Sequence, residues 1–291
     1  MISEKSMNYI YPIDPESDTA GSNLLRLVGK NKKVLEIGAG PGSLLKVLQE
    51  INHCDMTAIE IHPEYAEKLN EICQKVIVAD LNEPNWNKLI DINQKFDVVV
   101  AADVLEHIND PLGCLKNMTT LLNENGSIVI SLPHIGHAVI SACLWEGDFE
   151  YREWGLLDRT HIRFFGIKNV EKLIDDAQLK IIDVRFVIRS PDQTEFHERW
   201  SRLSHVLKKN ILKSPYACIY QIVLKAVPKD VQGIALTLTK VPIPKPSNIP
   251  MGILNETYYL TGFFRNVIRK SLSLNQKIKL MSLLKKWGLN V

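Results

Sequence analysis

Three glycines alternate directly after a short run of β-forming residues near the start of the chain. The segment 34–42 reads VLEIGAGPG, with glycines at positions 38, 40 and 42. Because glycine has no Cβ, its backbone reaches positive φ without strain, and a ligand can lie against the main chain. The dinucleotide fingerprint requires its third glycine or alanine at the position that Ser43 occupies. The loop therefore predicts a nucleoside ligand and disfavours a dinucleotide-dependent dehydrogenase.

Acidic residues stand at the ends of four consecutive strand-like segments. They are Glu36, Glu60, Asp80 and Asp103. A carboxylate at Glu60 can accept both hydroxyl protons of a ribose, and Asp80 lies one strand further along, where an adenine amino group needs an acceptor. Glu36 and Asp103 would place negative charge near an ammonium or sulfonium group. The four acids predict a ribonucleoside that carries positive charge, and they disfavour a phosphate-rich ligand.

Strand-like and helix-like segments alternate along the first part of the chain, which predicts a parallel sheet with crossover helices. The expected strands are 33–37, 56–61, 75–80, 96–103, 127–133, 181–188 and 218–227. Helices are expected over 43–51, from Pro63, from Asp110 or Pro111 to Leu122, over 167–177, and once more around Phe196, Trp200, Leu203 and Leu207. Residues 134–166 have no clear periodicity and predict a long loop beyond the carboxyl end of the fifth strand, the edge where open α/β sheets bind ligands.

Four motifs occur in the order VLEIGAGPG, AIE, VAD and FDVVVAADVLEHINDP, and together they resemble the motifs of class I S-adenosylmethionine-dependent methyltransferases. The resemblance covers residues 30–227. It implies an α/β fold with a Rossmann-like sheet of seven mostly parallel strands and helices on both faces, to which this chain adds a C-terminal basic helical extension. It also implies S-adenosyl-L-methionine as the cofactor.

The resemblance assigns a part of the cofactor to each motif. The residues implied are Gly38, Gly40 and Gly42 at the methionine part with Glu36 beside them, Glu60 and Ile61 at the ribose, Asp80 and Leu81 at the adenine, and Ala102 and Asp103 near the sulfonium. Segments 145–151 and 155–165 are similar to a bacterial subgroup associated with cell-surface polysaccharide synthesis. That similarity implies O-methylation of a sugar, a glycan or another small acceptor.

A hydroxyl acceptor must lose its proton, and a neutral histidine can take it. His161 is the first candidate base, followed by His107 and His134. For each of them a structural hydrogen-bonding role is the alternative. Trp145, Tyr151 and Trp154 would either line the acceptor site or pack in the core. Because no cluster with metal-ligand spacing is visible, we expect no metal.

The composition is that of a folded globular protein. The chain has 291 residues, of which 45% are hydrophobic and 23% charged. Its five cysteines are odd in number and lack the spacing of a disulfide framework or a zinc site, which favours a reducing compartment. The sequence shows neither a signal peptide nor an apolar run of membrane-spanning length. A cytoplasmic location is therefore expected.

The net charge of +2 conceals a basic C-terminal part. Residues 229–291 hold ten lysines and arginines against two acids. Four prolines between positions 242 and 250 favour an extended linker. We therefore expect a catalytic domain over 1–227, a proline-rich linker over 228–252 and a basic amphipathic helical tail over 253–291.

The basic tail leaves several roles open. It can be a solvated surface, it can lie on an anionic membrane, or it can dock on a protein partner. No nucleic-acid partner is expected, because no recognised binding motif accompanies the charge. The alternative to an enzyme is a non-catalytic adapter that keeps the cofactor site and recruits a partner through this tail.

Overall fold

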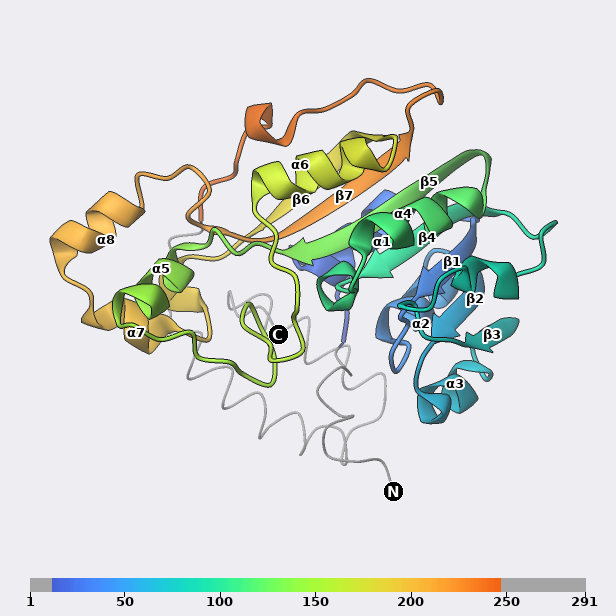
Figure 1. Ribbon diagram of the computed structural model, residues 1–291, viewed down its shortest axis with the longest axis horizontal. Helices are drawn as coiled ribbons and strands as arrows, with labels where there is room; N and C mark the ends of the chain where they lie inside the picture. The colour runs from blue at the N-terminus through green and yellow to red at the C-terminus, as the bar shows by residue number, and fades with distance from the viewer. Residues whose placement is uncertain (1–11, 247–291) are drawn as a thin grey trace. The chain divides into compact units, whose positions relative to one another are not determined.

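The computed structural model describes residues 12–246, which contain a seven-stranded sheet (Figure 1). Its strands are β1 (Lys33–Ile37), β2 (Asp55–Glu60), β3 (Lys75–Val78), β4 (Phe96–Ala102), β5 (Leu122–Pro133), β6 (Leu179–Ile188) and β7 (Ile219–Pro228). Their order is β3-β2-β1-β4-β5-β7-β6, and β7 alone runs antiparallel to its two neighbours. The predicted Rossmann-like, mostly parallel sheet is confirmed.

Helices cover both faces of the sheet, because side chains alternate between two cores along each strand. On one face α1 (Ala20–Val28), α2 (Ser43–Glu50) and α3 (Pro63–Leu69) pack over residues such as Val34 and Val100. On the other face α4 (Pro111–Thr120) and α6 (Ile167–Asp176) pack over residues such as Leu35 and Val99. The carboxyl ends of the parallel strands thus meet at one edge between the two layers.

A third apolar cluster lies beyond β5, where a long loop was expected. It is built from α5 (Ala138–Trp145), α7 (His197–Arg202) and the partly buried side of α8 (His205–Ile211). The expectation of an unbroken loop is wrong, because α5 reads AVISACLW and is apolar on all sides, so it carries no helical periodicity. The single extra helix is instead two, and the Ser204 hydroxyl caps the second by accepting the N–H of Leu207 at 3.3 Å.

Several element boundaries differ from the predicted ones. Helix α1 was not expected, and the hydroxyl of its N-cap residue, Thr19, accepts the N–H of Ser22 at 3.3 Å. Strand β5 begins at Leu122, whereas the sequence predicted a strand that begins at residue 127. These differences lie away from the predicted strand ends that carry the acids.

The compact unit continues past Val227, where the catalytic domain was expected to end. The N–H of Leu236 donates to the carbonyl of Ile181 at 2.8 Å, and Leu238 is fully buried against the core. Residues 228–246 of the expected linker therefore belong to the domain. The tail predicted at 253–291 lies outside the described residues. Within residues 12–246, no helix combines the length and the apolar character that a membrane span requires.

Candidate active site

The glycine loop joins β1 to α2, and its three glycines meet different surroundings. A Cβ on Gly38 would lie 2.8 Å from a methyl carbon of Val104, and one on Gly42 would lie 2.6 Å from a methyl carbon of Leu69. These two glycines allow the loop to pack closely. Gly40 has a φ of +54°, and a Cβ there would meet nothing within 4 Å. The open space beside Gly40 is where a ligand can approach the main chain.

Glu60 anchors this loop from the neighbouring strand. Its carboxylate accepts the N–H of Gly40 at 2.7 Å and the N–H of His62 at 2.8 Å. The N–H of Ala39 also donates to the carbonyl of Ile59 at 3.1 Å. Each carboxylate oxygen has a second lone pair, so Glu60 keeps acceptor capacity for ribose hydroxyls.

Glu36 is a buried acid beside Glu60. Both residues point to the sheet face covered by α1 and α2, because Glu36 is opposite Ala58 in the β1–β2 register and Glu60 lies two residues further on. Burial, with a contribution from Glu60, raises the pKa of the Glu36 carboxyl to about 8. Its Oε2 is buried and has no hydrogen-bond partner among the described residues. An orphaned carboxyl oxygen at this position suits a cationic ligand group that donates hydrogen bonds.

The residues that follow β2 and β3 are those assigned to the ribose and the adenine. Ile61, directly after β2, is 49% exposed, and Leu81, beyond β3, is partly buried. Apolar side chains at these strand ends can pack against the flat face of a base. One oxygen of Asp80 accepts the N–H of Asn82 at 2.8 Å, which fixes the turn after β3.

Asp103 follows Ala102 at the end of β4, and two residues that the sequence analysis missed hold it. The Ser131 hydroxyl donates to its carboxylate at 2.8 Å, and the Gln221 amide nitrogen lies 2.9 and 3.0 Å from the two carboxylate oxygens. Burial raises the pKa of Asp103, and these hydrogen bonds oppose the rise. The only sequence signal for Ser131 and Gln221 was a polar residue within each of two apolar strands.

The two leading candidate bases lie together next to a buried acid. Glu106 is 1% exposed, and its Oε1 lies 3.9 Å from the Nε2 of His161. The rings of His107 and His161 have centroids 4.8 Å apart. The backbone N–H groups of Ile162 and Arg163 both donate to the carbonyl of Glu106, which brings segment 161–165 to the end of β4.

Burial sets the charge of this cluster. It lowers the pKa of His161 to about 4 and raises the pKa of Glu106 well above its usual range, with a further contribution from Asp103. Burial thus favours the uncharged form of both side chains over an ion pair. His161 is in the unprotonated form that a general base requires.

Backbone carbonyls orient both histidine rings and fix the tautomer of His161. Because a carbonyl only accepts, the neutral ring of His161 donates from Nδ1 to the carbonyl of Leu156 at 3.4 Å, and Nδ1 of His107 donates to the carbonyl of Thr160 at 3.1 Å. The Nε2 lone pair of His161 can therefore accept a proton. One ligand atom from each of Glu106, His107 and His161 lies within 4.8 Å of the others, so these residues could also hold a divalent cation. This set was not expected, because His161 is distant from Glu106 and His107 along the chain.

The third candidate base, His134, is not part of this cluster. It is almost fully buried, and its Nδ1 lies 3.1 Å from the carbonyl of Ile219 at the start of β7. Burial lowers its pKa to about 4. The nearby His137 caps α5 by accepting the N–H of Val139 at 3.3 Å. The contacts of both histidines are those of structural residues.

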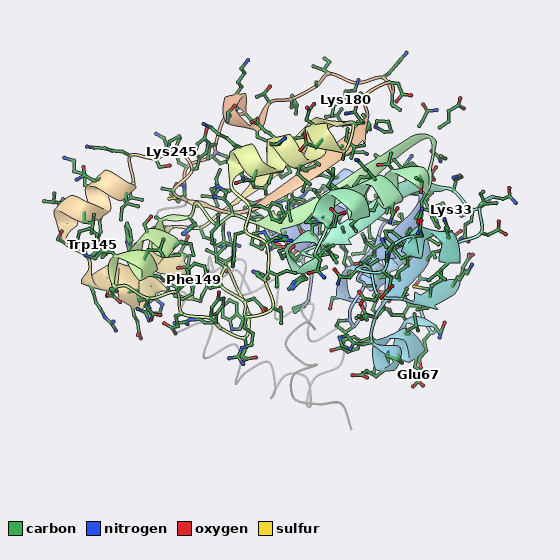
Figure 2. The ribbon with its side chains drawn as sticks, in the orientation of Figure 1. Lys33, Glu67, Trp145, Phe149, Lys180 and Lys245 are labelled. Carbon is green, nitrogen blue, oxygen red and sulfur yellow. The ribbon has the colours of Figure 1, made fainter. Side chains whose placement is uncertain are left out.

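Aromatic side chains are frequent in residues 145–164, the segment that contains His161. Phe149 makes edge-to-face contacts with Tyr151 and Phe164, at ring-centroid distances of 5.3 and 5.5 Å. Trp145 and Trp154 are 69% and 55% exposed, so core packing does not account for them. Figure 2 shows that Trp145 and Phe149 belong to the part of the molecule beside α5 and α7. These side chains are available to an acceptor or another partner.

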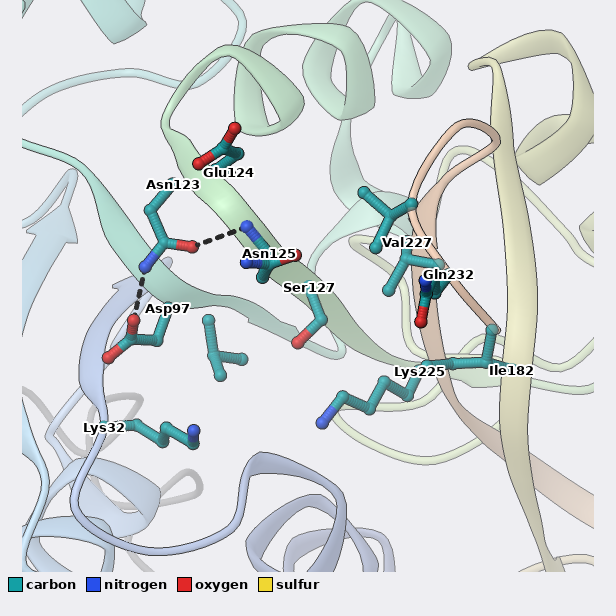
Figure 3. A pocket seen from close by; sticks show the side chains of 12 residues that line it. Lys32, Asp97, Asn123, Glu124, Asn125, Ser127, Ile182, Lys225, Val227 and Gln232 are labelled. Carbon is teal, nitrogen blue, oxygen red and sulfur yellow. Dashed lines mark hydrogen bonds between the residues drawn. The ribbon is translucent and has the colours of Figure 1, made fainter. Parts of the chain in front are cut away.

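A separate hollow of about 550 Å³ lies at the opposite edge of the sheet (Figure 3). It is lined by residues at the amino ends of the parallel strands, including Lys32, Asp97 and Asn123, and by Lys225 of β7. Asp97 binds the Asn123 amide and the N–H of Lys33, so it is engaged in holding the strand ends. None of the predicted site residues lines this hollow.

Comparison with known proteins identifies a family and a fold. A family model described as a methyltransferase domain matches residues 16–184. A solved SAM-dependent methyltransferase from Archaeoglobus fulgidus superimposes with a TM-score of 0.50 at 16% identity, covering 71% of this chain and 91% of that one. At this identity the structural likeness bears on the fold alone.

Two curated relatives match the chain over part of its length. The chain is 20% identical to the mitochondrial ubiquinone biosynthesis O-methyltransferase of Dictyostelium discoideum over 186 residues, which cover 60% of this chain and 58% of that protein. It is 32% identical to the ubiquinone biosynthesis O-methyltransferase of Haemophilus ducreyi over 108 residues, which cover 34% of this chain and 44% of that protein. The chain thus spans about half the length of these two relatives.

Proposed function

The chain belongs to the class I S-adenosylmethionine-dependent methyltransferase family, and on that premise we propose that it methylates a hydroxyl oxygen of a small acceptor. S-adenosylmethionine is the cofactor of this family. When bound, it supplies a methyl group activated by a sulfonium. The protein must then hold the donor, align the acceptor, exclude water and remove the acceptor proton.

Three observations support the fit of this cofactor to the carboxyl edge of the sheet. The space beside Gly40 is open to a ligand, the buried Oε2 of Glu36 lacks a partner, and Glu60 keeps acceptor capacity for a ribose. The carboxylate of Glu60, together with a Glu36 carboxyl that can ionise beside a bound cation, favours a cationic donor over a phosphate-bearing one. The residues that would hold it are Glu36, Gly38, Gly40, Gly42, Glu60, Ile61, Asp80, Leu81, Ala102 and Asp103.

The observation that carries the proposed reaction is the neutral His161 ring beside Glu106 at the end of β4. In the proposed step the acceptor oxygen forms its bond to the methyl carbon as the carbon–sulfur bond breaks, and the hydroxyl proton moves to Nε2 of His161. Positioned general bases contribute about 10²- to 10⁴-fold to such steps. His107 lies against His161 and is the second candidate for this role.

Two acceptor classes have separate support. A sugar or glycan hydroxyl follows from the similarity of segments 145–151 and 155–165 to the polysaccharide-associated subgroup. A hydroxy-aromatic acceptor follows from the names of the ubiquinone-related relatives. The exposed aromatic side chains of Tyr151, Trp154 and Phe164 can stack on either a sugar ring or an aryl ring. We place the sugar or glycan class first.

The acceptor is tested by incubating the full chain with methyl-labelled S-adenosylmethionine and two matched panels. One panel contains nucleotide sugars and oligosaccharides, and the other contains catechols and longer-chain hydroxy-aromatics. Label in the first panel supports the sugar assignment, and label confined to the second replaces it with the aromatic one. If S-adenosylhomocysteine binds but neither these panels nor a cell extract yields labelled product, the adapter alternative replaces the enzyme.

A further inference from the structure

We propose that Ser131 and Gln221 are positioning residues that aim the Asp103 carboxylate at the sulfonium of the methyl donor. This arrangement would make the site hold cationic S-adenosylmethionine in preference to neutral S-adenosylhomocysteine. The inference rests on the proposed function and assigns the residues that discriminate the donor from its product.

Asp103 is held from two neighbouring strands. The Ser131 hydroxyl of β5 donates to its Oδ1 at 2.8 Å, and the N–H of Asp103 donates to the same hydroxyl oxygen at 3.0 Å. The Gln221 amide of β7 reaches both carboxylate oxygens, at 2.9 and 3.0 Å. The carboxylate therefore has donors on both oxygens and little rotational freedom.

Sheet register explains why these residues converge. Ser131 is opposite Ala102 in the β4–β5 register, and Gln221 is opposite Pro133 in the antiparallel β5–β7 register. Because side chains alternate along a strand, Ser131 and Gln221 share the face that is covered by α1 and α2. Glu36 and Glu60 lie on that same face.

Asp103 reaches this face through an unusual backbone conformation. Simple alternation after Ala102 would send its side chain to the other face of the sheet. Its φ is +51°, a left-handed value that is uncommon for a residue with a side chain. The turn ends β4 and allows the carboxylate to reach Ser131 and Gln221. A strained residue held by several hydrogen bonds is typical of a functional position.

The chemistry of the two donors leaves the negative charge of Asp103 available. A serine hydroxyl and a glutamine amide are neutral, so they orient a carboxylate without cancelling its charge as a lysine or arginine would. In the part of the chain that the structure describes, no lysine or arginine forms an ion pair with Asp103. A partly buried carboxylate without a lysine or arginine partner can attract a cation from the ligand.

The neighbours of Asp103 indicate whether it would contact the sulfonium or the ammonium group of the donor. Asp103 interacts electrostatically with Glu106 and His107, the residues beside the candidate base His161. The methyl group must leave sulfur near that base. Glu36, by contrast, lies beside Glu60 and the glycine loop, where the donor's ammonium group would lie. S-adenosylhomocysteine keeps the ammonium but has a neutral sulfur, so only the sulfonium distinguishes donor from product.

The test measures the dissociation constants of the full chain for S-adenosylmethionine and S-adenosylhomocysteine by calorimetry. We expect Gln221→Met, which keeps the side-chain length, to weaken donor binding by about tenfold while product binding changes by less than about twofold. Ser131→Ala should shift the ratio in the same direction, and Asp103→Asn should shift it most. Ser127→Ala, four residues earlier on β5 and among the residues that line the separate hollow, is the matched control and should leave the ratio unchanged.

Three results would overturn the inference. Equal weakening of both ligands would mean that Asp103 serves the ammonium group or only supports the fold. Unchanged affinities would mean that the hydrogen bonds to Asp103 have no part in binding. If Gln221→Met does not fold, the decision rests on Ser131→Ala, for which an unchanged ratio excludes the proposal. Failure of the unsubstituted protein to bind either ligand would instead refute the proposed function.

Discussion

The carboxylate of Glu60 lies 2.7 Å from the backbone nitrogen of Gly40 and binds it, so β2 holds the glycine loop that follows β1. Two features read separately from the sequence, a glycine-rich turn and an acid one strand away, therefore form one structure. The acid fixes the loop in the shape that leaves open space beside Gly40. A ligand at this edge would meet the loop and the acid together.

Substitutions of the glycines should separate ligand binding from folding. Gly40→Val would place side-chain atoms in open space, so we expect a folded protein that has lost at least tenfold in affinity for S-adenosylhomocysteine. The left-handed backbone there should cost about 1–2 kcal/mol of stability. Gly42→Ala would add a similar backbone cost and a contact at 2.6 Å to Leu69, so it should destabilise more. Urea unfolding and ligand calorimetry check both; equal affinities for Gly40→Val and the unsubstituted protein would contradict the assignment.

Glu36 should make the ligand-free protein less stable as pH rises. Its folded pKa of about 8 lies above the ordinary value of 4.5, so above pH 4.5 the unfolded chain releases a proton that the folded chain retains. Stability is thus lost as pH rises from 4.5 to about 8, by at most about 5 kcal/mol. Glu36→Gln should flatten this dependence in urea unfolding at pH 5.5 and pH 8.

The control for Glu36 is Glu50→Gln, because Glu50 is exposed and forms only a 3.9 Å pair with Lys46. It should leave the pH dependence as it is in the unsubstituted protein. If Glu36→Gln retained the full slope between pH 5.5 and pH 8, a different buried group would be responsible for it.

Removing the candidate base should affect turnover and leave cofactor affinity in place. His161→Ala is expected to lower kcat by about 10²-fold or more, because a positioned general base contributes about 10²- to 10⁴-fold. Its dissociation constant for S-adenosylhomocysteine should change by less than about twofold. His197→Ala, a change on α7, serves as the control. A kcat within about twofold of the unsubstituted enzyme would remove His161 from the catalytic residues.

The local part of the fold was predictable from the sequence. The strand at 33–37 is a β-forming run that ends at glycines, and the strand at 96–103 is nearly continuous in apolar residues. Their acids, Glu36 and Asp103, mark the strand ends directly. Helix α5 was not predictable in this way, because a helix that is apolar on all sides shows neither helical nor strand periodicity. The end of the domain was also missed, because residues 228–252 were expected to form a proline-rich linker, whereas Leu238 packs in the core.

The site residues that could be predicted from the sequence are those at the carboxyl ends of successive parallel strands. Glu36, Glu60 and Asp103 were found because parallel strands bring their carboxyl ends to one edge. Gln221 was missed because it lies near the start of the antiparallel strand, whose amino end reaches that same edge. The contact between His161 and Glu106 depends on backbone bonds from Ile162 and Arg163, which join segments that are distant in the sequence.

The central claim is that the carboxyl edge of this sheet is shaped for a cationic adenosine donor. Its most direct test is calorimetric titration of the full chain with S-adenosylhomocysteine and, separately, with NAD. We expect saturable one-site binding of S-adenosylhomocysteine that is weakened by Glu60→Ala, and no binding of NAD. Binding of NAD without binding of S-adenosylhomocysteine would contradict it.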